Sequence, residues 1–140
     1  MNMRISDEDR VFLNRFTACV VRKEEFRHLD HVHLAWILLA DDSLLTALLR
    51  FRALLKAFAA HHGVPGLYNE TITCFYMLLI RDCMEQMGGT HGWESFKEAN
   101  PELFCYPKTL LESYYPGGVA FSEQAKHAFL LPLVSSAEAA

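Results

Sequence analysis

Two short stretches of this sequence place ionisable side chains directly before an apolar run. RHLDHVHLAW, residues 27–36, contains three histidines, and GLYNETITCFYMLLI, residues 66–80, contains a glutamate between an aromatic loop and the most hydrophobic segment of the chain. Histidine and glutamate are among the side chains that most often transfer protons in enzymes. The sequence therefore predicts an acid/base site in which Glu70 works with His28 and His31.

The first stretch is expected to begin a helix, and that position affects the charge of its histidines. With Asp30 as the N-cap residue, Leu29 and Leu34 have the spacing of a hydrophobic staple. His28 then lies just outside the helix and His31 at its first position. Both are at the positive end of the helix dipole, which disfavours imidazolium at pH 7. A neutral histidine can accept a proton or bind a metal.

The second stretch repeats this arrangement. Asn69 is the expected N-cap residue, and Glu70 lies in the first turn, where the helix dipole stabilises a carboxylate. A glutamate at this position often serves only the helix end. However, Tyr68 precedes it, and Thr73 lies one turn further on the same face of an otherwise apolar helix. We therefore expect Glu70 to point into a pocket as its general base or acid.

Neighbouring side chains are candidates for holding a substrate. They are polar or aromatic residues within or beside the two stretches: Arg27, His33, Trp36, Tyr68, Asn69 and Thr73. Arginine suits an anionic group near helix N-termini, and aromatic side chains suit a planar organic molecule. A surface ion pair for the arginine and core packing for the aromatic residues are the alternative uses.

A metal site is the main alternative to the acid/base site. His28, His31 and Glu70 would supply two imidazoles and one carboxylate to Zn or Fe, with Asp30 or His33 in reserve. The HxxH spacing with a distant glutamate is a weak signal, so the preferred interpretation is a site without a cofactor. A metal-dependent hydrolase or oxygenase and a non-catalytic small-molecule-binding module stay open as alternatives.

The residues of the site must be positioned by helices, because the hydrophobic periodicity along the chain is helical. Four main helices are expected over residues 7–21, 30–40, 44–62 and 70–87. Prolines break the last third into shorter helices, with Asn100 and Ser122 as caps and Pro101 and Pro107 at first-turn positions. The predicted fold class is all-α, a compact helical bundle whose central helix is 70–87.

Length and charge exclude several classes of protein. The 140 residues suit a single helical domain, with a frayed tail at 135–140. A net charge of −4 without a basic stripe argues against nucleic acid as a partner. The N-terminus lacks an apolar leader and no apolar run reaches about 20 residues, so we expect a cytoplasmic protein without a membrane partner. The apolar richness is compatible with a homodimer.

With these residues in view, the chain resembles a family of small all-helical bacterial proteins of mostly unassigned function. The family pattern is F followed shortly by HxDHVxLAW and then YHETIT before an apolar helix. The matching stretches are FRHLDHVHLAW and YNETIT, with weaker likeness from WESFKEANPELF to AFLLPL. The matching positions are Phe26, His28, Asp30, His31, Trp36, Tyr68, Glu70, Thr71 and Thr73.

One departure from the family pattern concerns Asn69, whose position is commonly histidine. If that histidine is a metal ligand in the family, this chain lacks it, which favours Glu70 as a base or Asn69 as a substrate-orienting group. Small proteins with similar features also occur in natural-product pathways, where they catalyse cofactor-free condensations or cyclisations such as Pictet–Spengler reactions. By this analogy we expect a small metabolic enzyme acting on a small polar or anionic organic substrate.

Overall fold

The computed structural model describes residues 4–105 and 110–132, and the regular elements in these two ranges are all helical. The longer helices are α1 (Asp7–Thr17), α2 (His28–Asp41), α3 (Leu44–His61) and α4 (Glu70–Gln86). The shorter helices are α5 (Trp93–Ala99), α6 (Leu110–Tyr114) and α7 (Glu123–His127). The 3-10 turns are η1 (Lys23–Glu25), η2 (Pro65–Leu67), η3 (Pro101–Phe104) and η4 (Pro116–Phe121). The predicted all-α class, with four main and several shorter helices, is confirmed.

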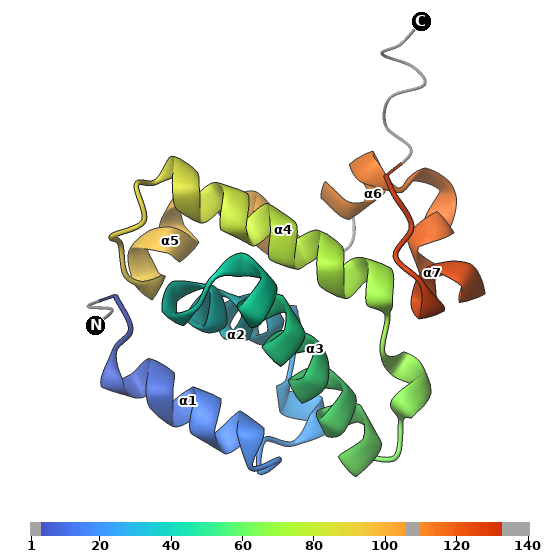
Figure 1. Ribbon diagram of the computed structural model, residues 1–140, viewed down its shortest axis with the longest axis horizontal. Helices are drawn as coiled ribbons and strands as arrows, with labels where there is room; N and C mark the ends of the chain where they lie inside the picture. The colour runs from blue at the N-terminus through green and yellow to red at the C-terminus, as the bar shows by residue number, and fades with distance from the viewer. Residues whose placement is uncertain (1–3, 106–109, 133–140) are drawn as a thin grey trace, which may run out of the picture.

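Helix α4 lies on one side of α2 and α3, opposite α1 (Figure 1). It packs against α2 and α3, while α1 packs against the same two helices from the other side. The carboxy-terminal end of α4 lies near α5, and its amino-terminal end lies near α7 (Figure 1). The last described elements of the chain therefore cover the start of α4.

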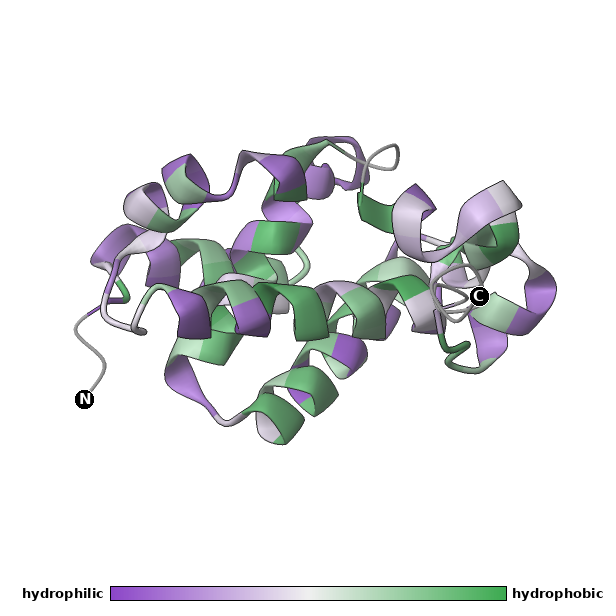
Figure 2. Ribbon diagram, turned by 90° about the horizontal axis from the view of Figure 1, so that it is seen from above, coloured by the Kyte–Doolittle hydropathy of each residue, from purple (hydrophilic) through white to green (hydrophobic). Residues whose placement is uncertain are grey.

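The centre of the core is α2 rather than the predicted helix 70–87. Every residue from Leu34 to Ala40 is buried, because α1, α3 and α4 each cover part of α2. Helix α4 instead leaves Leu78 45% exposed and ends in charged turns. Figure 2, which views α4 from outside, shows hydrophobic residues along its first part and hydrophilic residues towards its carboxy-terminal end. None of the described helices combines the length and the apolar character needed to cross a membrane.

The first two helices differ from the predicted boundaries. Helix α1 ends at Thr17 instead of residue 21, because the chain turns through a left-handed conformation at Cys19, with φ 60°. Helix α2 begins at His28, and Asp30 is not its N-cap residue. The N-cap position belongs to Arg27, whose backbone N–H donates to Oδ2 of Asp30 at 3.1 Å. The predicted staple is wrong for the same reason, and Leu29 is 42% exposed.

The caps of the later helices are closer to the predictions. Asn69 caps α4, since its Oδ1 accepts from the N–H of Ile72 at 2.9 Å, and Ser122 caps α7 in the same way. Ser43 precedes α3 as predicted, but its hydroxyl donates to a side chain and not to the helix backbone. Asn100 precedes η3 without a side-chain cap bond. The predicted first-turn Pro107 and the tail at 135–140 lie outside the described residues.

Candidate functional site

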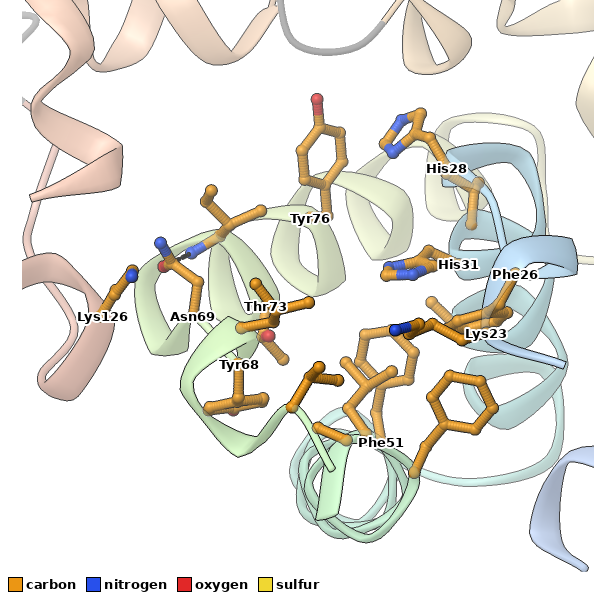
Figure 3. A pocket seen from close by; sticks show the side chains of 18 of the residues that line it. Lys23, Phe26, His28, His31, Phe51, Tyr68, Asn69, Thr73, Tyr76 and Lys126 are labelled. Carbon is orange, nitrogen blue, oxygen red and sulfur yellow. Dashed lines mark hydrogen bonds between the residues drawn. The ribbon is translucent and has the colours of Figure 1, made fainter. Parts of the chain in front are cut away.

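A pocket of about 640 Å³ lies between α2, α3 and α4. This volume is within the range of about 300–1,000 Å³ that is usual for small-molecule sites. Its inner surface is largely apolar and includes Phe26, Phe51, Leu55, Phe58 and Ile80. The polar side chains that line it are Lys23, His28, His31, Tyr68, Asn69, Thr73, Tyr76 and Lys126 (Figure 3).

His31 projects from the first part of α2 into this pocket (Figure 3). Its ring stacks on Phe26 with the ring centroids 4.0 Å apart, and neither ring nitrogen hydrogen-bonds to another group within the described part of the chain. Burial, with a smaller contribution from nearby His28, lowers the pKa of His31 to about 4. His31 is therefore a neutral imidazole at pH 7 and faces an apolar pocket.

His28 occupies the first position of α2, where it lines the pocket and also contacts η3 and α4. Its Nε2 lies 2.7 Å from the carbonyl oxygen of Leu103 in η3. A carbonyl can only accept, so Nε2 carries the proton, and the lone pair of the neutral ring is on Nδ1. Burial lowers the pKa of His28 although the bond to Leu103 acts in the opposite direction. The edge of its ring meets Tyr76, with centroids 5.0 Å apart.

Glu70 does not line the pocket, and the structure does not bring it to the two histidines. Its carboxylate oxygens lie 2.8 and 3.1 Å from Nε of Arg52 on α3, and Oε1 accepts from the hydroxyl of Tyr68 at 2.7 Å. Burial acts to raise the pKa of Glu70, but the hydrogen bonds from Arg52 and Tyr68 outweigh it and hold this pKa below its ordinary value. The acid/base partnership predicted for Glu70 with His28 and His31 is replaced by a pairing with α3.

Tyr68 connects Glu70 to the pocket. Its ring lines the pocket while its hydroxyl donates to the carboxylate outside it. Burial raises the pKa of Tyr68 strongly, and the bond to Glu70 raises it further. The ammonium group of Lys56 lies 5.2 Å from the ring centroid. Glu70 therefore contacts the lining of the pocket through its hydrogen bond with Tyr68.

Asn69 and Thr73 line the pocket at the start of α4, as expected from their place beside Glu70. Both polar atoms of the Asn69 amide form hydrogen bonds. Oδ1 caps the helix, and Nδ2 donates to the carbonyl oxygen of Ala120 at 2.8 Å. This second bond joins α4 to η4. The Asn69 side chain therefore forms part of the pocket wall, and its polar atoms are hydrogen-bonded to the protein.

Three residues predicted to bind substrate do not line the pocket. His33 lies 2.7 Å from the Oδ1 atom of Asp9 and stacks on Trp93, with centroids 4.3 Å apart. Trp36 is part of the buried core. Arg27 is exposed at the N-cap of α2. Their proximity in sequence to His28 is misleading, because successive residues of a helix point in different directions.

The structure adds residues that the sequence analysis missed. Lys23, Tyr76 and Lys126 line the pocket, and Arg52 binds Glu70. Tyr76 lies one turn beyond Thr73 on α4, so helical spacing could have identified it. The lysines offered no comparable signal, since Lys23 is in a charged loop and Lys126 reaches the pocket only because α7 packs on α4.

Metal ligands were the alternative use of His28, His31 and Glu70. Residues 4–105 and 110–132 contain no group of three His, Cys, Asp or Glu side chains that could hold a metal ion, so these three do not form one. What the described residues do assemble is an apolar pocket with two neutral histidines in its wall. Comparison with known proteins finds no family model, no curated protein and no solved structure that matches the chain.

Proposed function

We propose that the protein binds a small, largely apolar organic molecule in the pocket between α2, α3 and α4, and that His31 exchanges a proton with it. The observation that carries this proposal is the position of His31. Its imidazole faces an apolar pocket, is neutral at pH 7 and has no hydrogen-bond partner within the described part of the chain. A ligand with an acidic or hydrogen-bonding group would supply that partner.

The low pKa of His31 suits a proton that is taken up and then returned. An imidazolium in this apolar setting is costly, so the protonated ring is a strong acid and gives the proton back readily. A condensation or cyclisation, the reaction class offered by the analogy with small proteins of natural-product pathways, requires both steps. In this proposal His31 is the catalytic residue, and Glu70 contributes by orienting Tyr68.

The first test is ligand binding in the pocket. Phenylnaphthylamine, a neutral dye that fluoresces in apolar surroundings, should bind the wild-type protein. Val64 lines the pocket between α3 and η2, so Val64→Phe should fill part of the volume and weaken dye binding about tenfold. Val11→Phe on the surface of α1, where Val11 is 56% exposed, is the matched control and should bind the dye like wild type. Equal binding by both variants would contradict the proposed pocket.

The second test concerns His31 itself. Imidazole resonances are assigned by NMR with His31→Gln, and the dye is then titrated into the wild-type protein. The resonances of His31 should move, while those of the exposed His127 on α7 should not. Identical behaviour of the two histidines would overturn the role of His31 and leave a binding pocket only.

A further inference from the structure

The charged side chains that line the pocket all have the same sign. Two lysines and no aspartate or glutamate are among the lining residues, although the whole chain has 17 acidic and 13 basic residues. The side chains of Lys23 and Lys126 point into the pocket from opposite sides, one from η1 and the other from α7 (Figure 3). The local charge of the pocket is therefore opposite to the net charge of the protein.

These lysines are only weakly neutralised by other groups of the protein. Lys23 has no ion-pair partner among the described residues. Lys126 lies 3.7 Å from Glu123, whose side chain is 81% exposed, so solvent screens that pair. Glu70, which follows the lining residue Asn69 in the sequence, is bound by Arg52 and Tyr68.

We infer that the molecule bound in this pocket is an organic acid with an apolar body, and that Lys23 and Lys126 attract its anionic group. The inference rests on the proposed function and specifies its substrate class. The body of the acid would contact the aromatic floor formed by Phe51 and Phe58. The starts of α2 and α4, which also line the pocket, add positive dipole ends that favour an anion. A cationic amine, the substrate of a Pictet–Spengler reaction, would meet only like charges.

The test compares three competitors that share one naphthalene ring and differ in charge. Naphthoate, naphthalenemethanol and naphthylmethylamine are each used to displace the neutral dye phenylnaphthylamine. The expected order of affinity is acid, then alcohol, then amine. Binding of the acid should weaken as the salt concentration rises, and binding of the alcohol should not, since salt screens only the charged interaction.

Substitution of the lysines identifies the source of the preference. Lys23→Gln and Lys126→Gln should each weaken naphthoate binding about threefold, the range of an exposed ion pair, and the double variant about tenfold. Naphthalenemethanol should bind all of these variants like wild type. Lys97→Gln on α5, outside the pocket, is the matched control and should leave every affinity unchanged.

The possible failures are distinguishable. If the alcohol binds as tightly as the acid, or if the lysine variants weaken both equally, the preference for an organic acid is wrong while the pocket stands. If neither the dye nor any competitor binds, both the substrate class and the proposed function fail. Both lysines are polar surface residues, so the variants should keep the wild-type circular dichroism spectrum.

Discussion

Nε of Arg52 lies 2.8 Å from Oε1 of Glu70, so a side chain of α3 neutralises the carboxylate at the start of α4. The same oxygen accepts from the hydroxyl of Tyr68. This arrangement explains why a charge can stand next to the most apolar segment of the chain. It also keeps that charge out of the pocket: of Arg52, Tyr68 and Glu70, only Tyr68 lines it.

Replacing Glu70 with glutamine should lower the free energy of unfolding at pH 7 by about 1 kcal/mol, because the ion pair with Arg52 is partly exposed. The pKa of Glu70 is depressed in the folded protein, so the stabilisation is complete above the unfolded pKa and is lost as the pH falls through the folded pKa. In urea unfolding from pH 7 to pH 3, the free energies of unfolding of wild type and Glu70→Gln should therefore converge as the pH falls.

A matched control for this prediction is Glu85→Gln, which removes the exposed partner of Arg81 within α4. Its effect should stay below about 0.5 kcal/mol, as for other surface pairs one turn apart. A Glu70→Gln protein as stable as wild type at pH 7, or a difference that persists in acid, would argue against the pairing.

His31 should make the protein less stable in mild acid. Its pKa is about 4 in the folded protein and about 6.5 in the unfolded chain, so the unfolded chain binds more protons between these values. The free energy of unfolding must then fall as the pH falls from about 6.5 to about 4. In His31→Gln this contribution is absent. Between about pH 6.5 and about pH 4, the free energy of unfolding of wild type should therefore fall by up to about 3 kcal/mol more than that of the variant.

Urea unfolding at a series of pH values measures this slope. His127→Gln, at an exposed position of α7, should keep the slope of wild type. Parallel pH profiles for wild type and His31→Gln would mean that His31 is not buried as a neutral ring.

His33 should matter for stability and not for ligand binding. His33→Leu keeps the packing against Phe12 and Trp93 but removes the bond to the buried Asp9. A buried carboxylate that loses a hydrogen bond costs about 2 kcal/mol, measured by urea unfolding. Affinity for phenylnaphthylamine should be unchanged, and a large loss of dye binding would place His33 in the pocket.

Thr71 should hold the last described segment against α4. Its buried hydroxyl donates to the carbonyl oxygen of Ala128 at 3.1 Å and accepts from the N–H of Leu130 at 3.0 Å. Thr71→Val has nearly the same shape but leaves both backbone groups without this partner, at a cost of about 2 kcal/mol. Amide exchange at Leu130 should become faster in Thr71→Val. Thr71→Ser, which keeps the hydroxyl, should exchange like wild type.

The sequence predicts features that depend on local chemistry. Helix periodicity indicates the all-α class, and Asn69 caps α4 because an N-cap bond spans only three residues. His28, His31 and Tyr68 line the pocket since both helix starts face it. The charge partner of Glu70 could not be found in this way.

What the sequence could not predict depends on how helices pack. Arg52 is one of several basic residues of α3, and it is an ion-pair partner of Glu70 only because α3 packs against α4. Helix α2 is the central helix because three other helices pack against it. Both α2 and α4 are rich in apolar residues, so composition alone did not show which of them is central. Lys126 contributes to the pocket from a short helix whose docking depends on contacts such as those of Thr71.

The wall of the pocket also has a consequence for protein synthesis. Its residues are spread along the chain from Lys23 to Lys126, and the side that carries Phe121 and Lys126 leaves the ribosome last. A nascent chain that ends before η4 has the aromatic residues Phe51 and Phe58 but lacks both Phe121 and Lys126. A ligand of this pocket would therefore meet its complete wall only in the finished fold, which it would stabilise by mass action.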